Sequence, residues 1–235
     1  MTRYVLLNNI DHRDLRVDPR RGEAFGDGAM FALAVPSEFR NLQAHYPIVF
    51  QRAQDGGCRP VALLGLRQGE NLFLAGDRWD AHYIPLAMDR LPFAIGAEGG
   101  QPMVHIDLDH PRVLSGQGEA LFREHGGTTG YLERVNSVLR ALHDGLGVVP
   151  SFVALLDELQ LLEPFVLDIE LDDGTRHSLS GFQTIQEERL GMLDGASLQR
   201  LMQAGFLEPI YMAMASLSNF RALIERMNRA HASHG

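Results

Sequence analysis

Short apolar runs separated by turn-forming residues fill the first half of the chain and predict β-strands there. Six runs of this kind are expected strands: residues 31–35, 47–50, 61–64, 71–74, 93–95 and 103–108. A Gln-Asp-Gly-Gly sequence at residues 54–57 lies between the second and third runs and predicts a hairpin. Ser37 is expected to cap a helix over residues 38–45.

The hydrophobic period changes in the second half of the chain. Apolar residues recur at helical spacing over residues 132–142 and again over residues 152–162. Because residues three and four apart share one face of a helix, this pattern predicts two amphipathic helices. Thr128 or Thr129 is expected to cap the first of them.

The last third of the chain combines one hairpin with further helices. Residues 166–171 and 177–182 flank an Asp-Asp-Gly-Thr turn, the clearest hairpin signal in the sequence. The spacing from Thr184 to Glu187 matches a capping box and predicts a helix that runs to Leu193. Two more helices are expected: residues 197–204, ended by Gly205, and one closing helix over residues 210–227.

These elements together predict an α+β fold. An antiparallel, β-rich layer over about residues 1–115 is expected to pack with a mainly helical layer over about residues 116–235, which contains one hairpin. We interpret residues 1–235 as a single domain because no flexible linker, repeat or low-complexity segment separates the layers. Two separate domains are the alternative.

Composition narrows the class of protein. Of the 235 residues, 45% are apolar, which is enough for an ordinary buried core. The net charge is -9 and no basic run occurs, which argues against nucleic-acid binding. We find no secretory signal and no run of membrane-spanning length, so a cytoplasmic protein is expected. The single cysteine, Cys58, excludes an internal disulfide and is expected to be structural.

The sequence His-Ile-Asp-Leu-Asp at residues 105–109 is the first candidate for chemistry. Alternate residues of a strand share a face, so His105, Asp107 and Asp109 are expected to point together. A His-x-Asp pair with a distant histidine, such as His143 or His177, is the ligand set of non-haem iron oxygenases. The alternative is an ordinary strand with its apolar residues packed inward.

A second candidate is the segment around the only tryptophan. Arg78, Trp79, Asp80, His82 and Tyr83 form a mixed aromatic and charged sequence of the kind that binds a sugar, a peptide or a planar ligand. The alternative is that these aromatic residues belong to the core.

No catalytic residues are predicted. The glycine clusters lack both the dinucleotide-binding fingerprint and a P-loop lysine, and no Gly-x-Ser-x-Gly sequence occurs. No cofactor is expected unless the His105 hypothesis holds, in which case the cofactor is iron or another divalent metal.

Three groups of short sequences carry a resemblance to a known family. They are PVALLGL at residues 60–66 followed by GENLF at 69–73; Trp79 with YIP at 83–85 and PF at 92–93; and LSG at 179–181 with EERL at 187–190 and SLSN at 216–219. In their order and spacing, the chain resembles the bacterial SapC family over essentially its full length. Relatives show acidic residues rather than a histidine near residues 103–110, which weakens the iron hypothesis.

The resemblance implies a function only in outline. The family is named after a protein linked to a bacterial surface layer, and its members are encoded beside TonB-dependent receptors, halogenase-like flavoproteins and cupin-type oxygenases. No catalytic residues carry over from it. We therefore interpret the chain as a non-enzymatic accessory protein with a flavoprotein or receptor-associated partner. The alternatives are a metal-dependent enzyme using His105 and Asp107, and a surface-layer component. The sequence leaves the oligomeric state open.

Overall fold

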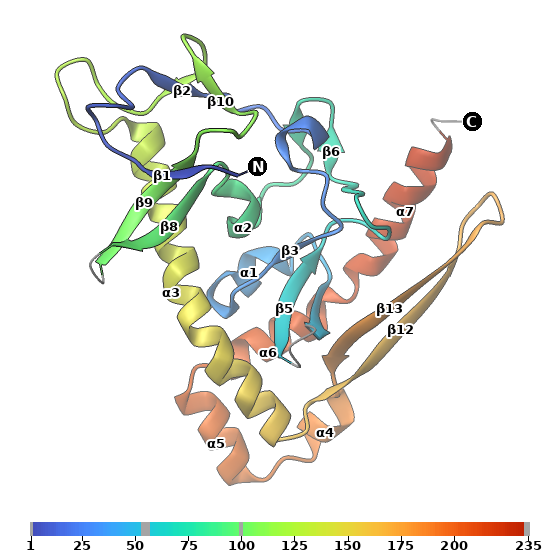
Figure 1. The fold of residues 1–235 in the computed structure, drawn as a ribbon. Coiled ribbons are helices and arrows are strands. Elements are labelled where there is room, and N and C mark those ends of the chain that lie inside the picture. The colour runs from blue at the N-terminus through green and yellow to red at the C-terminus, as the bar shows by residue number, and fades with distance from the viewer. Residues whose placement is uncertain (1, 53–56, 99–100, 233–235) are drawn as a thin grey trace. The chain divides into compact units, whose positions relative to one another are not determined.

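The computed structural model describes residues 2–52, 57–98 and 101–232 (Figure 1). Helices make up 36% of the structure and strands 27%. Antiparallel sheets occupy the N-terminal half and helices dominate the C-terminal half, so the predicted α+β class is confirmed.

The chain forms two compact units whose segments alternate along the sequence. Unit 1 comprises Met1–Gly28, Leu74–Asp80 and Leu86–Asp144. Unit 2 comprises Ala29–Phe73, Ala81–Pro85 and Gly145–Gly235. The prediction of a single domain with layers that meet near residue 115 stays a prediction.

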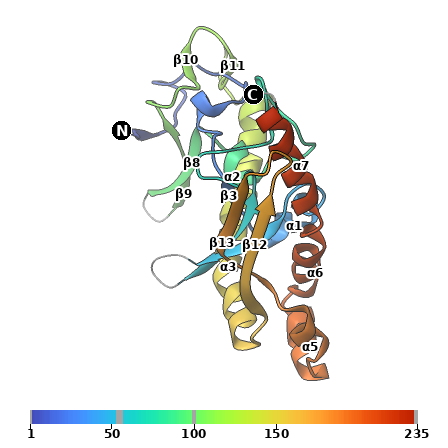
Figure 2. The ribbon, with the colours of Figure 1, turned by 90° about the vertical axis from the view of Figure 1, so that its right-hand side faces the viewer.

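Unit 1 is built mainly from short antiparallel strands (Figure 2). One sheet has the order β1 (Tyr4–Leu6), β9 (Gln101–Asp107) and β8 (Phe93–Glu98). A second sheet places β2 (Leu15–Val17) between β10 (Val113–Ser115) and β11 (Glu119–Ala120). Unit 1 also contains the β6 (Leu74–Ala75) and β7 (Arg78–Trp79) ladder, the 3-10 helix η1 (Glu23–Phe25), the helix α2 (Leu86–Asp89) and the first part of α3 (Gly130–Glu158).

The strands predicted over residues 93–95 and 103–108 correspond to β8 and β9. The strand predicted over residues 71–74 is wrong except at Leu74, because the chain turns before β6 begins. Strands β1 and β2 were not predicted, since three residues each are too short to show a period.

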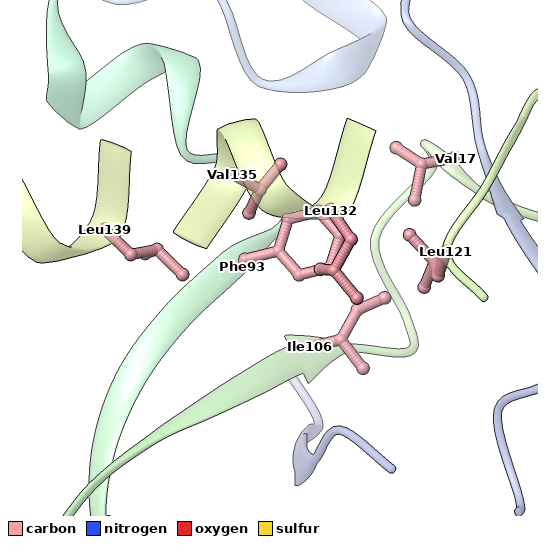
Figure 3. Packing of buried hydrophobic residues seen from close by; sticks show 7 residues of the cluster. All are labelled: Val17, Phe93, Ile106, Leu121, Leu132, Val135 and Leu139. Atoms are coloured by element: carbon pink, nitrogen blue, oxygen red, sulfur yellow. The ribbon is translucent and has the colours of Figure 1, made fainter. Parts of the chain in front are cut away.

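The core of unit 1 joins residues of both sheets to one helix (Figure 3). Its buried members are Val17, Phe93, Ile106, Leu121, Leu132, Val135 and Leu139. Val104 and Leu108 pack against this cluster on the same side as Ile106, as strand alternation requires. Burying each large apolar side chain contributes about 1.5–3 kcal/mol, so this cluster contributes strongly to the stability of unit 1.

Helix α3 (Gly130–Glu158) replaces the two helices predicted over residues 132–142 and 152–162. Thr129 is the predicted cap: its hydroxyl accepts a hydrogen bond from the Leu132 N–H at 3.3 Å. Pro150 lies inside the helix, and Gly145 lies beside Val35, where an added Cβ would come within 2.6 Å of the valine Cβ. Gly145 therefore marks the point where the backbone of α3 lies close to Val35, and the helix continues through it.

Among the described residues, α3 alone is long and apolar enough to cross a membrane. Its most apolar 18-residue window has a mean hydropathy of 1.3, and 33% of that window is buried. The sequence led us to expect no such stretch. Length and composition alone do not place α3 in a membrane, because helices of water-soluble proteins can pass the same test.

Unit 2 contains a five-stranded antiparallel sheet. Its order is β12 (Leu162–Glu170), β13 (Arg176–Ile185), β4 (Ile48–Arg52), β5 (Cys58–Leu63) and β3 (Phe31–Leu33). Both predicted hairpins are present, β4 with β5 and β12 with β13. The turn of the second one contains Gly174 with φ 81°, a backbone conformation that favours glycine. The turn predicted at residues 54–57 lies outside the described residues except for Gly57.

Six helical elements complete unit 2: η2 (Pro36–Glu38), α1 (Phe39–Leu42), α4 (Glu187–Gly191), α5 (Gly195–Gln203), α6 (Leu207–Ser216) and α7 (Asn219–Ala232). The second half of α3 belongs to the same unit. Helix α5 matches the prediction, and Gly205 with φ 74° follows it. Phe152 packs against Phe39, Phe50 and Phe206 with ring centroids 5.1–6.1 Å apart.

Three helix predictions for unit 2 are corrected by the structure. Ser37 lies inside η2, so it does not cap a helix. Thr184 is part of β13, and α4 starts after Gln186 without a side-chain cap. The prediction of a single closing helix is wrong, because the helix is interrupted between α6 and α7. There the Ser216 and Ser218 hydroxyls donate to backbone carbonyls.

Candidate functional site

The predicted metal ligands lie on β9 and on the turn after it. The His105 ring lies against Gly96, and its Nδ1 atom is 3.1 Å from the Met103 carbonyl oxygen. Asp107 is 2% exposed, and its Oδ1 atom accepts hydrogen bonds from the backbone N–H groups of Arg3 and Asp109. This carboxylate therefore ties the start of the chain to β9.

Asp109 is exposed and forms an ion pair with Arg3. Among the described residues, no three His, Cys, Asp or Glu side chains gather closely enough to hold a metal ion. His143 is exposed on the unit 1 part of α3, and His177 belongs to unit 2. The metal site stays a prediction.

The predicted aromatic site is divided between the two units. Arg78, Trp79 and Asp80 belong to unit 1, where Trp79 is half-buried on β7. His82 and Tyr83 belong to unit 2. The Tyr83 hydroxyl donates to Glu38 at 3.0 Å, so this side chain helps to hold the buried carboxylate at the end of η2. Ligand binding by these residues stays a prediction.

Cys58 lies on β5 with its sulfur 3.8 Å from the Gln183 side-chain oxygen. Burial raises the pKa of the thiol to about 11, and the Asp157 carboxylate adds to the shift. The thiolate is the nucleophilic form of cysteine, so Cys58 is a poor nucleophile near neutral pH.

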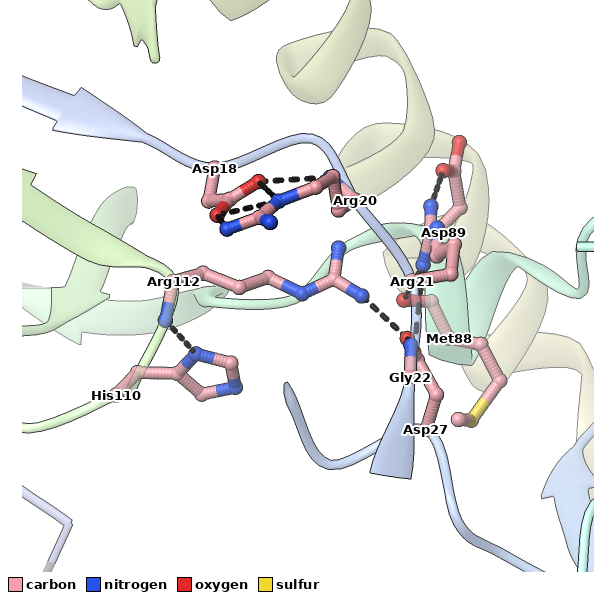
Figure 4. A network of polar contacts seen from close by, with 9 residues as sticks. All are labelled: Asp18, Arg20, Arg21, Gly22, Asp27, Met88, Asp89, His110 and Arg112. Carbon is pink, nitrogen blue, oxygen red and sulfur yellow. Dashed lines mark hydrogen bonds and ion pairs between the residues drawn. The ribbon is translucent and has the colours of Figure 1, made fainter. Parts of the chain in front are cut away.

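The most concentrated polar chemistry lies in unit 1, around the fully buried carboxylate of Asp27 (Figure 4). Asp27 accepts a hydrogen bond from Arg112, whose side chain is 2% exposed, and a longer contact of 3.5 Å from Arg21. The Gly22 N–H donates to the same carboxylate at 2.9 Å. Arg21 also pairs with Asp89 and donates to the Met88 carbonyl.

A second pair, Asp18 with Arg20, lies beside this network (Figure 4). Hydrogen bonds from Arg20 lower the pKa of Asp18, so this carboxylate stays ionised well into the acidic range. Arg20 and Arg112 each stack on the Phe25 ring, at 5.7 and 5.5 Å from its centroid. Three arginines of this region are thus matched by three aspartates: Arg20 by Asp18, Arg21 by Asp89 and Arg112 by Asp27.

The burial of Arg112 and of its neighbour His110 shifts the pKa values of both side chains. Burial lowers the pKa of the guanidinium, and the neighbouring Arg21 lowers it further. Burial likewise lowers the pKa of His110, whose Nδ1 atom accepts the Arg112 backbone N–H. The Nε atom of Arg112 is buried without a hydrogen-bond partner among the described residues. Because the charges balance, we interpret the network as a clamp that fixes the N-terminal segment of unit 1.

Sequence reasoning missed this network. Arg112 and Asp27 are separated by 85 positions, and no local pattern relates them. The one available signal is the density of charge in residues 18–27, which precede the first predicted strand and resemble an exposed loop.

The second half of α3 presents apolar side chains at the surface of unit 2. Leu146 and Val148 are 39% and 40% exposed. A shallow hollow of about 260 Å³ lies beside Val148, where α3, η2 and the α5–α6 connection meet. Its lining is mainly apolar and includes Pro36, Phe206 and Pro209. Glu208 is the one charged residue that lines it.

The comparison with family models agrees with the short sequences that resemble a known family. The model described as SapC matches residues 7–223. The chain belongs to the SapC family. The match includes most of both units of this SapC protein, so neither unit is an addition to the family fold. No curated protein and no solved structure matches the chain.

Proposed function

We propose that this SapC protein is a non-enzymatic accessory protein that binds a protein partner through unit 2. The observation that carries the proposal is the exposed apolar side chain of Val148 on α3, which lines a hollow formed mainly by apolar side chains. Apolar surface gains free energy when a partner removes it from water, at roughly 25 cal/mol per Å². A hollow with an apolar lining gives a partner side chain a place to bury, and contiguous apolar surface is typical of interaction sites.

The resemblance to SapC proteins suggests which partners to test. A halogenase-like flavoprotein is the first candidate, and a TonB-dependent receptor or a protein associated with it is the second. The proposed role is to support such an enzyme or uptake system in the cytoplasm. The family name suggests surface-layer association as an alternative, which cell fractionation would favour if the protein were found outside the cytosol.

The proposal is tested by measuring binding of the purified protein to each candidate by biolayer interferometry. We expect the dissociation constant to lie at or below about 10 µM. Val148→Lys should weaken binding at least about tenfold, because it places a charge where the partner buries apolar surface. Ala154→Lys, at an exposed position on a different face of α3, is the matched control.

Thermal unfolding must show that both variants keep the stability of the parent protein. If no candidate binds with a dissociation constant at or below about 10 µM, the accessory function is overturned. Equal binding by Val148→Lys and the parent would show that this surface is not the one used.

A further inference from the structure

We propose that the free edge of strand β12 binds an extended, basic segment of the partner as an additional strand. The inference rests on the accessory function proposed above and specifies the partner's chemistry. Strand addition is a common mode of peptide recognition, in which backbone hydrogen bonds provide affinity and side chains provide specificity.

Strand β12 is the terminal strand of the five-stranded sheet in unit 2. Within the described ranges, it pairs with β13 alone. Strand β13 pairs with β4 only at Phe182 and Gln183, so the remainder of the hairpin extends past the sheet (Figure 1). The outer edge of β12 is therefore available along the extended part of the hairpin.

The backbone groups that point outward can be assigned from the hairpin register. The Leu171 N–H donates to the Thr175 carbonyl at 2.9 Å, so Leu171 faces inward. Because direction alternates along an antiparallel ladder, the N–H and C=O groups of Asp168 and Glu170 point away from β13. Toward the base, Pro164 has no N–H and the register shifts between Phe165 and Leu167. The usable edge is the half of β12 nearer the turn.

Helix α7 holds this hairpin from one face (Figure 2). Phe165 stacks on Phe220 with ring centroids 5.1 Å apart, and the Asp172 N–H donates to Asn228 at 3.1 Å. The opposite face is exposed, and Val166 on it is 61% exposed. The edge is thus preorganised, which reduces the entropy that binding costs.

Charge identifies the occupant as basic. Residues 162–173 contain five carboxylates and no Lys, Arg or His. A hydrogen bond from Thr175, supported by His231, lowers the pKa of Asp173 to about 2, so this carboxylate is ionised at neutral pH. Arg176 pairs with Glu170, but both side chains are largely exposed, and such pairs are weak. The acidic character of the edge therefore remains.

A hollow of about 460 Å³ lies over the same part of the hairpin, lined by Asp168, Ile169, Glu170, Arg176, His177 and Ser178. The Nε2 atom of His177 is buried and has no hydrogen-bond partner among the described residues. This hollow provides space for a side chain of the added strand, next to the carboxylates that would receive a cation.

The same charge disfavours a second copy of the chain as the occupant. Pairing two β12 edges would bring the Asp168 and Glu170 carboxylates of both copies together, and residues 162–173 contain no basic residue to lie between them. Like charges on neighbouring strands destabilise the pair. A basic segment of a different protein satisfies both the hydrogen-bonding edge and its charge.

The inference is tested with a fluorescein-labelled peptide in which lysine alternates with valine and threonine. A peptide of the same length with glutamate in place of lysine is the matched probe. We expect fluorescence anisotropy to show binding of the lysine peptide only, with an affinity that falls as salt rises. Hydrogen exchange should slow at Asp168 and Glu170 when the lysine peptide is bound.

Variants separate charge from backbone hydrogen bonding. Asp168→Asn with Glu170→Gln should weaken lysine-peptide binding at least about tenfold, whereas Glu188→Gln on α4 should leave it unchanged. Asp168→Pro removes an outward N–H and should weaken binding more than Asp168→Asn. If Asp168→Pro unfolds, the exchange data and the charge variants still decide the question.

Equal binding of both peptides, no slowing of exchange, or concentration-dependent dimers formed through β12 would overturn the inference. The accessory function is assessed separately with the candidate partner proteins. If those partners bind and the charge variants do not weaken them, the basic-strand inference fails while the accessory function stands. If no partner binds, the accessory function fails even when the peptide binds.

Discussion

Replacing Asp27 with asparagine tests whether the buried charges of unit 1 form a clamp. The side chain keeps its size, but the negative charge between Arg21 and Arg112 is lost. Asp27 is 0% exposed and Arg112 is 2% exposed, so water cannot take the place of the carboxylate. Arg21 keeps Asp89 as a partner, whereas Arg112 loses its charged partner within the network.

The expected cost follows from this burial. Removing one member of a buried ion pair destabilises a protein by about 3–5 kcal/mol, because the remaining charge is left uncompensated. For a chain of this length, about 2–4 °C of melting temperature corresponds to each kcal/mol, so Asp27→Asn should lower it by about 6–20 °C. An exposed pair gives a contrasting expectation: Glu158→Gln, which breaks the pair with Arg200, should cost less than about 1 kcal/mol.

Fluorescence of the only tryptophan provides the assay. Trp79 belongs to unit 1, and the Asp77 carbonyl in the adjacent turn accepts the Arg21 N–H at 2.9 Å. Urea unfolding followed at this residue therefore reports on unit 1 and its clamp. Combining Asp27→Asn with Arg112→Met should cost less than the sum of the two single changes, by about 0.5–3 kcal/mol.

Two results would refute the reasoning. One is a cost for Asp27→Asn no larger than that for Glu158→Gln. The other is full additivity in the double variant, which would mean that Asp27 and Arg112 do not stabilise each other.

Three further predictions follow from other parts of the chain. Gly145→Ala should lower the free energy of unfolding by about 1–3 kcal/mol, because the new Cβ overlaps Val35. Gly147→Ala has open space around it and should raise the free energy of unfolding by up to about 1 kcal/mol. Urea unfolding measures both, and equal effects of the two variants would contradict the close approach of α3 to Val35. Iodoacetamide labelling of Cys58, followed by mass spectrometry, should be slow at pH 8 and accelerate toward pH 11; labelling at pH 8 as fast as in urea would contradict this. Protein purified without chelators should contain metal far below one ion per chain by elemental analysis, and His105→Ala should not change that content; stoichiometric metal lost in this variant would instead favour the metal-dependent enzyme.

Local patterns in the sequence determined most of the regular elements. The alternation around Ile106 indicated which face of β9 is buried, because a strand has a period of two. The turn that contains Gly174 indicated the β12–β13 hairpin, and Gly205 indicated the end of α5. Each of these signals lies within a few residues of the structure that it specifies.

The tertiary structure decided the features that depend on distant neighbours. In the local sequence Gly145 weakens the helical pattern. In the structure its missing Cβ allows the backbone of α3 to pack closely against Val35. Whether Asp27 is solvated or buried against Arg112 depends on a contact across 85 positions, and the exposed edge of β12 depends on which strands pair. Periodicity records the preference of each segment for helix or strand, whereas burial and pairing arise only when segments meet, so the clamp and the proposed binding edge required the folded chain.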